Sequence, residues 1–265
     1  SDNVMNLTGI EDAHKPIFFC SFGKDSSSIL HALKPYLHKT LVAFIDCGAT
    51  YPDVTEFARG KGKSLPLFLY HQTPGDFWTD VREKGFPVGV DIPEISGFAG
   101  ETLGFDPFVY KHKIRPWTHC IYERVWLQVN KIVEDYKPDL FISGERSIDR
   151  PFAKWQDKTG GETAVKTLRP IFDWSDEDVW EYVEANKIEL PLTFQGKQKD
   201  RRDCWACLGG HDFTPGRIKE LKEDWPDLYH KLFIEEGFSE VLPQIEKHLK
   251  AQMKILAEVK AVIYA

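Results

Sequence analysis

Short apolar segments alternate with helical patterns over most of the chain, and this alternation restricts the fold more than any other feature. Five segments rich in Val, Ile, Leu and Phe have the length of buried strands; they cover residues 17–20, 40–47, 65–71, 139–145 and 166–172. Helical patterns lie between and after them; they cover residues 26–37, 51–65, 76–84, 118–136 and 175–186. This order predicts an α/β fold with a doubly wound, mostly parallel five-stranded sheet.

The expected domain organisation has two parts. Residues 1–210 would form the α/β domain, and residues 211–265 a helical C-terminal extension. Within that extension, the apolar stripe of residues 241–263 either faces a core or forms a homodimer seam. Ligands of doubly wound sheets bind at the carboxyl ends of the strands, so loops that follow strands are expected to face one cleft.

Charge and composition argue against several classes of function. The formal net charge of -7 does not favour nucleic acid as a partner, although a local basic patch can still bind phosphate or sulfate. The chain has no apolar run of about 18 residues, so we expect no membrane span, and its first residues show no signal-peptide pattern. The odd number of cysteines, five, indicates a reducing cytoplasm in which they act as thiols or ligands.

The first predicted strand runs directly into Ser-Phe-Gly-Lys-Asp-Ser-Ser, residues 21–27, which open a helix. A glycine at position 23 would let the backbone turn tightly. The amides and the positive dipole end of the helix would attract an anion. Serine hydroxyls and a mobile Lys24 would add donors for phosphate oxygens. The alternative is an ordinary strand–turn–helix junction with a serine cap.

These residues resemble the pyrophosphate-binding loop Ser-Gly-Gly-x-Asp-Ser of the N-type ATP pyrophosphatases, with Phe22 at the first glycine position. Further segments follow in the order found in the phosphoadenosine phosphosulfate (PAPS) reductase family of that PP-loop superfamily; they are residues 45–54, 143–155, 168–183 and 203–210. The resemblance implies a Rossmann-like fold of the adenine-nucleotide α-hydrolase type. The chain is most similar to the ATP sulfurylase small subunit and to the sulfonucleotide reductases.

The resemblance also places nucleotide-binding positions on this chain. Asp46 would lie near the sugar or a metal ion, and Cys47 follows it where the family has Thr. Cys47 is expected near the nucleotide, without an assigned chemical role. The expected nucleotide-binding residues are Ser21, Phe22, Gly23, Lys24, Asp25, Ser26, Ser27, Asp46 and Gly144.

The intact Lys-Asp-Ser of the loop favours ATP, because the sulfonucleotide reductases of the family lack it. ATP would be cleaved between its α and β phosphates and AMP passed to an acceptor, with Mg²⁺ on the pyrophosphate beside Asp25 or Asp46. Arginine forks suit an anionic acceptor such as sulfate. The expected catalytic residues are Lys24, Asp25, Arg146 and Arg150. The plainer interpretation of the two arginines is a solvated, salt-bridged loop.

The pair Cys204 and Cys207 has the spacing of half a metal site. By family alignment Cys120 is the third expected ligand, and its neighbour is His119. Three thiolates can hold a [4Fe–4S] cluster with one open iron, and three thiolates with His119 can hold Zn²⁺. The pair as a redox dithiol, or three thiols without a ligand, are the other interpretations.

Three functions stay open at this level. The first is an ATP-dependent adenylyl transferase of sulfur metabolism or sulfur insertion. The second is a sulfonucleotide (PAPS or APS) reductase that releases sulfite. The Glu-Cys-Gly-x-His segment that bears the catalytic thiol of those reductases is missing, since the last cysteine is Cys207. The third is a non-catalytic nucleotide-binding subunit that needs a partner. The aromatic-rich residues 85–113 would be a long loop serving as a lid or partner surface.

Overall fold

The computed structural model describes residues 5–88, 113–149, 165–195, 204–207 and 215–241. The chain divides into two compact units. The first unit contains Ser1–Asp46, Tyr51–Gln72 and Asn130–Asp203, and the second contains Cys47–Thr50, Thr73–Val129 and Cys204–Ala265. The expected domain boundary between residues 210 and 211 lies outside the described residues and stays a prediction.

The first unit contains the five-stranded sheet that the sequence predicts. Its strands are β1 (Pro16–Phe19), β2 (Leu41–Asp46), β3 (Phe68–Gln72), β6 (Leu140–Ile142) and β7 (Lys166–Leu168). Their order is β3-β2-β1-β6-β7, and all neighbouring pairs are parallel. The α/β, doubly wound fold is thereby confirmed. The strands β6 and β7 are shorter than the apolar segments from which they were predicted.

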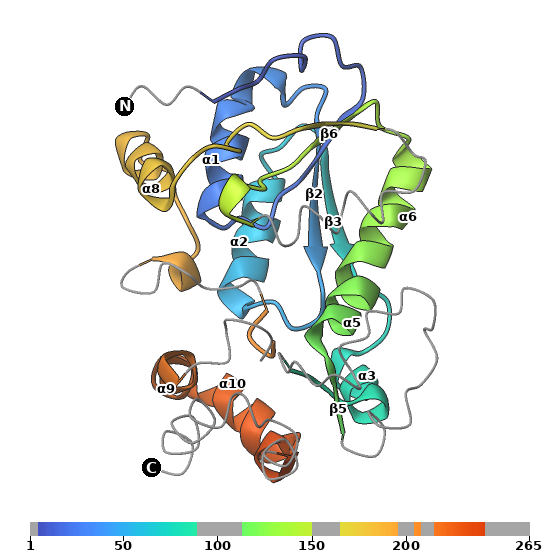
Figure 1. Cartoon of the computed structure of the whole chain (residues 1–265), viewed down its shortest axis with the longest axis vertical. Coiled ribbons are helices and arrows are strands. Elements are labelled where there is room, and N and C mark those ends of the chain that lie inside the picture. The colour runs from blue at the N-terminus through green and yellow to red at the C-terminus, as the bar shows by residue number, and fades with distance from the viewer. Residues whose placement is uncertain (1–4, 89–112, 150–164, 196–203, 208–214, 242–265) are drawn as a thin grey trace. The chain divides into compact units, whose positions relative to one another are not determined.

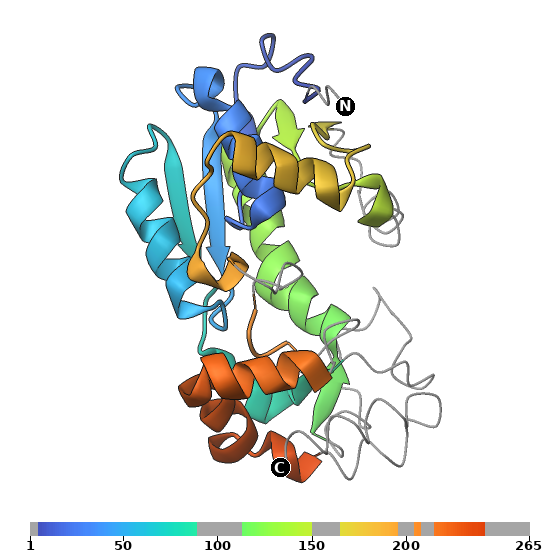
Figure 2. The same ribbon diagram turned by 90° about the vertical axis from the view of Figure 1, so that its left-hand side faces the viewer.

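Helices cover both faces of this sheet. They are α1 (Lys24–Ala32), α2 (Pro52–Gly62), the part of α6 (Leu127–Tyr136) from Asn130 on, and α8 (Asp176–Ala185), with short turns η1 (Lys34–Tyr36), η3 (Ser147–Asp149) and η4 (Leu192–Phe194). Figure 1 shows α1 and α2 on one side of β2 and β3 and α6 on the other. Figure 2 shows α8, in gold, lying against α1.

Local sequence signals set the ends of these helices. Pro52 opens α2 at its first turn, where the missing amide hydrogen costs nothing. Ser175 and Asp178 form a reciprocal capping box at the start of α8, as the sequence predicts. Ile29 of α1 and Leu33, the C-cap residue of α1, are fully buried, as are Ile17 and Val42 of the strands. Burial of these side chains between α1 and the sheet fixes the helix, so the N-terminus of α1 stays at the carboxyl ends of the strands.

The sheet order reverses at β1, which pairs with β2 on one side and β6 on the other. The carboxyl ends of all five parallel strands lie at one edge. Loops diverge to opposite faces where the order reverses, and ligands of doubly wound sheets bind there. The loop after β1 and the loop after β6 meet at this edge.

The second unit is built around a small parallel ladder of β4 (Phe86–Val88) and β5 (Ile114–Pro116). Its helices are α3 (Phe77–Lys84), α5 (Trp117–Ile121), the π-helical turn η2 (Tyr122–Trp126), α9 (Pro215–Asp224), α10 (Pro226–His230) and the π-helical turn η6 (Lys231–Glu235). The start of the expected long loop, residues 85–113, therefore forms the strand β4, and β5 begins directly after its end. Residues 89–112 between them lie outside the described residues.

The helix predicted over residues 118–136 is interrupted. The π-helical turn η2 separates α5 from α6, and π turns are frequent at functional sites. The predicted tail helix of residues 241–263 falls almost wholly outside the described residues, so neither its core-facing nor its dimer interpretation is tested. Across the described residues, every helix is too short or too polar to cross a membrane.

Candidate functional site

The turn between β1 and α1 is made by Phe22. Its φ is 61°, in the left-handed region that glycine adopts most easily. Gly23 has φ -69° and ψ 173° and serves as the N-cap of α1. The expectation that Gly23 supplies the tight turn is therefore wrong. The residue that departs from the family's glycine carries the strained conformation itself.

Packing of the Phe22 ring explains why this residue can keep its left-handed backbone conformation. The ring is 1% exposed and contacts the rings of Phe44, Phe57 and Phe68 at centroid distances of 5.7, 5.7 and 6.4 Å. Left-handed backbone at a non-glycine residue costs on the order of 1–3 kcal/mol. Burying an aromatic side chain in a core contributes about as much or more. The aromatic cluster therefore holds the loop in shape.

The N-terminus of α1 is left without a side-chain cap from its N-cap residue, Gly23. Ser26 Oγ lies 3.2 Å from Ser21 Oγ and 3.3 Å from the Gly23 carbonyl oxygen. Ser27 Oγ is buried and has no hydrogen-bond partner among the described residues. A β-carbon on Gly23 would meet nothing closer than Ser21 Oγ at 3.5 Å, an ordinary contact. Protein packing alone does not demand glycine here, whereas close approach of a ligand to the backbone would.

Two cations and two carboxylates meet beside this helix end. Lys24 Nζ lies 2.9 Å from both Asp25 Oδ2 and Asp176 Oδ1. Arg146 Nε lies 3.0 Å from Asp25 Oδ1, and Arg146 Nη1 lies 2.8 Å from Asp176 Oδ1. Lys24 is buried and fixed rather than mobile, which corrects the expectation from the sequence. The four side chains compensate one another, so an incoming phosphate must compete with two carboxylates for these cations.

Asp176 is the site residue that sequence reasoning missed. It is the first residue of α8, inside a segment in which only the capping pattern was recognised. Partial burial alone would raise the pKa of the Asp176 carboxyl, but Lys24 and then Arg146 outweigh it and lower that pKa. The available signal was a run of acidic residues at a helix start that follows a strand of the same sheet.

The remaining expected nucleotide-binding positions lie at the same edge of the sheet. Asp46 ends β2 and accepts a hydrogen bond of 2.6 Å from the Tyr70 hydroxyl. A β-carbon on Gly144, two residues after β6, would lie 4.0 Å from the Ser26 amide nitrogen. Arg150 lies outside the described residues, so its catalytic role stays a prediction.

In the second unit, the segment Cys47–Thr50 pairs with the segment around Cys204. An antiparallel bridge joins Thr50 and Cys204, and the Trp205 amide donates to the Ala49 carbonyl oxygen at 2.9 Å. The Cys47 and Cys204 thiols are hydrogen-bonded to each other. Cys47, which had no assigned role, is thus in direct contact with a predicted metal ligand.

Cys47, Cys120, Cys204 and Cys207 form one group, here called the cysteine group. Cys120 interacts electrostatically with Cys207 and Cys47, and Cys204 does so with Cys207 and Cys120. All five cysteines of the chain are described, and none of them forms a disulfide. The fifth, Cys20, is buried in the first unit. The three expected ligands therefore lie together, with Cys47 added to them.

Two thiols of the cysteine group, those of Cys120 and Cys204, are poor acids. Burial raises the pKa of Cys120 to about 12, although Arg115 opposes this. The hydrogen bond with Cys47, together with burial, raises the pKa of Cys204. In the part of the chain that the structure describes, no three His, Cys, Asp or Glu side chains are already arranged around a single metal ion. Ligation to a metal would replace the protons that Cys120 and Cys204 hold at neutral pH.

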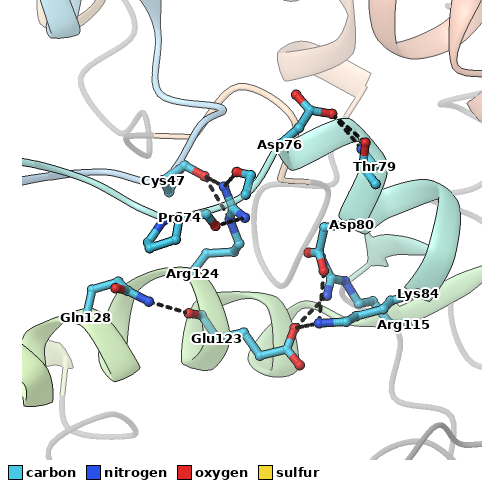
Figure 3. Close-up of polar contacts among 11 residues, drawn as sticks. Cys47, Pro74, Asp76, Thr79, Asp80, Lys84, Arg115, Glu123, Arg124 and Gln128 are labelled. Carbon is cyan, nitrogen blue, oxygen red and sulfur yellow. Dashed lines mark hydrogen bonds and ion pairs between the residues drawn. The ribbon is translucent and has the colours of Figure 1, made fainter.

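Three arginines contact the segments that carry the cysteines. Arg124 donates to the Cys47 carbonyl oxygen from Nε at 3.0 Å and from Nη2 at 2.9 Å. Arg217 donates to the Cys204 carbonyl oxygen at 2.7 Å. Arg115 interacts with Cys120, and it also forms ion pairs with Asp80 and Glu123 that Figure 3 shows. Three guanidinium groups therefore lie around the cysteine group, and Arg115 is neutralised by its two carboxylate partners.

Comparisons with known proteins show similarity to enzymes of sulfur chemistry. A model of the phosphoadenosine phosphosulfate reductase domain matches residues 101–215. A phosphoadenosine 5'-phosphosulfate reductase of Xylella fastidiosa strain M23 is 24% identical over 192 residues, which are 68% of each chain. An uncharacterized protein of Methanocaldococcus jannaschii is 24% identical over 214 residues, which are 80% of this chain and 45% of that protein.

Among solved structures, the chain is similar to a U34-tRNA thiolase, NcsA, from Methanococcus maripaludis with its [4Fe-4S] cluster. The TM-score is 0.40 at 16% identity, and the likeness covers 96% of this chain and 76% of that one. This level of likeness supports no argument about function. The domain match and the sequence relatives show that the chain is similar to the phosphoadenosine phosphosulfate reductase family.

Proposed function

We propose that the chain binds ATP at the carboxyl edge of its sheet and transfers the adenylyl group to an oxyanion acceptor of sulfur chemistry. One observation carries this proposal: Lys24 and Arg146 converge beside the uncapped N-terminus of α1, where the strand order reverses. Helix amides and two cations are the groups that stabilise a leaving pyrophosphate.

Each residue then has a defined task. The α1 amides, with the hydroxyl of Ser27, bind the β and γ phosphates, and Lys24 and Arg146 balance the charge that develops on them. An acceptor oxygen attacks the α-phosphorus, the bond from that phosphorus to the bridging oxygen breaks, and pyrophosphate leaves with that oxygen. Asp46 suits Mg²⁺ better than Asp25, because Asp25 already binds two cations, while Asp46 accepts a hydroxyl.

The test is pyrophosphate release from ATP and Mg²⁺ with sulfate as the first acceptor. Lys24→Ala should weaken ATP binding by about tenfold or more, since a charge-assisted bond contributes roughly 1.5–3 kcal/mol. Lys34→Ala, which removes an exposed lysine beyond α1, is the matched control and should leave binding unchanged. ATP binding that is equal in wild type and Lys24→Ala would refute the site.

A second pair of variants separates site arginines from structural ones. Arg146→Ala should lower both ATP affinity and turnover. Arg169→Ala removes an arginine that binds Glu145 at 2.7 Å and should affect stability alone. ATP binding without turnover on any acceptor would instead support a non-catalytic subunit that needs a partner.

Reduction of a phosphosulfate nucleotide is the second candidate, because the Xylella relative carries that name. Such a reaction needs a reactive thiolate, whereas burial raises the pKa of Cys120 to about 12. Sulfite release from phosphoadenosine phosphosulfate and a thiol reductant, with no pyrophosphate formed from ATP, would favour this candidate over adenylyl transfer.

The cysteine group is proposed to hold a metal centre, with Cys120, Cys204 and Cys207 as ligands of a [4Fe–4S] cluster. Two observations fit an anionic centre there. Four thiols from three segments lie together, and Arg115 Nε is a buried donor without a hydrogen-bond partner among the described residues. When bound, such a cluster supplies electron transfer or holds a sulfur atom. Zn²⁺ with His119 is the alternative, and metal analysis of anaerobically purified protein decides between them.

A further inference from the structure

Cys47 is positioned like a member of the metal-binding set rather than like a nucleotide contact. Its thiol is hydrogen-bonded to that of Cys204 and lies 3.6 Å from the Thr50 hydroxyl. The bridge between Thr50 and Cys204 fixes the backbone of both segments. Cys47 therefore approaches Cys204 through paired backbone, and a change of side-chain rotamer alone does not separate the two segments.

The corner at Cys47 is tightly built. Gly48 has φ 88°, and a β-carbon there would lie 2.9 Å from Arg124 Nη2 and 3.1 Å from Phe77 Cβ. Arg124 therefore packs where any other residue at position 48 would place its side chain. This close fit keeps the Cys47 carbonyl oxygen hydrogen-bonded to the Arg124 guanidinium, and so holds Cys47 at the cysteine group.

Arg124 also places a positive charge beside Cys47, and a buried positive charge is stabilised by a nearby anion. It is 6% exposed, and its hydrogen bonds run to the carbonyl oxygens of Cys47, Pro74 and Gly75. Figure 3 shows it directed at these carbonyls, apart from the carboxylates of Asp80 and Glu123. Within the described residues it forms no ion pair. A buried cation is costly without a nearby negative charge.

We propose that Cys47 is the fourth thiolate ligand of the metal centre, so that the protein saturates a [4Fe–4S] cluster and leaves no iron open. The inference rests on the proposed cluster at Cys120, Cys204 and Cys207. When the cluster binds, each of the four thiols would release one proton to solvent and form one bond to iron. The thiolate of Cys47 then supplies negative charge next to the buried Arg124.

A saturated cluster has a different chemistry from an open one. With three protein thiolates, one iron can take an external sulfur or substrate. With four, the cluster can transfer electrons or stabilise the fold, but it cannot hold a substrate sulfur on an iron without losing a ligand. The inference thus assigns the cluster to electron transfer or folding rather than to sulfur delivery.

The test uses the full chain, reconstituted anaerobically with ferrous iron and sulfide. Wild-type protein should bind about four irons and resist mild oxidation by ferricyanide. Cys47→Ser should lose one iron under the same treatment and give the EPR signal of a three-iron cluster. Cys20→Ser is the matched control, since it alters a buried cysteine of the other unit, and it should behave as wild type.

The outcomes distinguish failure of the proposed metal centre from failure of the role proposed for Cys47. Wild-type protein that takes up no iron refutes the metal centre itself. Wild-type protein that forms the cluster but converts to the three-iron form under mild oxidation overturns the role of Cys47 alone. A Cys47–Cys204 disulfide in protein that holds a full cluster would also overturn it. The wild-type measurement needs no variant, so the test holds even where Cys47→Ser fails to fold.

Discussion

The ammonium of Lys24 lies 2.9 Å from the carboxylate of Asp176, which joins the first residue of α1 to the first residue of α8. Arg146 binds the same carboxylate oxygen. Asp176 therefore binds the two cations that a nucleotide phosphate would need under the proposed function. If the proposed function holds, Asp176 competes with that phosphate for Lys24 and Arg146.

Asp176→Asn should strengthen ATP binding, because it removes a negative charge next to both cations. The gain should be about threefold to tenfold, as the carboxylate is half exposed and screened. Glu177→Gln removes the neighbouring acidic charge of the same helix turn and should have a much smaller effect. Isothermal titration of the three proteins with ATP and Mg²⁺ measures this. Weaker binding by Asp176→Asn would show that Asp176 positions Lys24 instead of competing for it.

The same residue predicts a pH effect on stability. The pKa of Asp176 is lowered in the folded state, so the carboxylate contributes stability above its ordinary pKa of 3.8. That contribution is lost as the pH falls through the lower folded value. Thermal melts between pH 6 and about pH 3 should show a shallower acid decline for Asp176→Asn than for Glu177→Gln. Parallel curves would contradict the shift.

Phe22→Gly tests whether the aromatic cluster or the backbone strain dominates in the β1–α1 loop. Glycine removes a strain of roughly 1–3 kcal/mol, but losing a buried Phe side chain costs about 3–5 kcal/mol. We expect a net loss of about 2 kcal/mol in the free energy of unfolding. Lys137→Gly, at an exposed residue with φ 51°, relieves similar strain without loss of packing and should stabilise slightly. Urea denaturation of both variants measures the difference, and a more stable Phe22→Gly would refute the account.

The sequence predicts the sheet well because buried parallel strands are short, continuously apolar and separated by helices. The Pro52 start of α2 and the capping box of α8 follow from local chemistry. The β4–β5 ladder was missed because three-residue strands in a Gly- and Pro-rich stretch have too few residues to show a period. The π-helical turn η2 was missed because one extra residue hardly alters helical spacing.

The site was predicted less completely than the sheet, because several of its residues are far apart in the sequence and come together only in the fold. Lys24 and Arg146 are recognised from their motifs. Asp176 joins them only because β7 lies beside β6, which brings the start of α8 to the same edge. Cys47 joins Cys204 through a backbone bridge between segments more than 150 residues apart, and no local pattern reports such a bridge.

Gly48→Ala should disturb the cysteine group through the backbone. The substitution forces a β-carbon into a left-handed residue and to 2.9 Å from Arg124 Nη2, at a cost of about 1 kcal/mol or more. Gly60→Ala is the matched control, because nothing lies within 4 Å of a β-carbon there. It lies inside α2, where alanine stabilises by about 0.4–1 kcal/mol. Iron content after reconstitution should fall for Gly48→Ala and stay unchanged for Gly60→Ala. Normal iron binding by Gly48→Ala would show that the corner tolerates movement.

Alkaline pH should destabilise the metal-free protein through Cys120. Its pKa is raised from 9.0 to about 12 by burial in the folded state. A raised pKa means that the neutral thiol contributes stability below pH 9, and this contribution is lost as the pH rises towards 12. Each pKa unit corresponds to about 1.4 kcal/mol, so the loss amounts to a few kcal/mol.

Melting temperatures of metal-free wild type should therefore fall more steeply above pH 9 than those of Cys120→Ala. Cys20→Ala controls for removal of a buried thiol elsewhere, and a Cys120→Ala curve that parallels the wild type would show that the thiol ionises without cost. With the cluster bound, the protons have already left, so the same protein should lose this alkaline sensitivity.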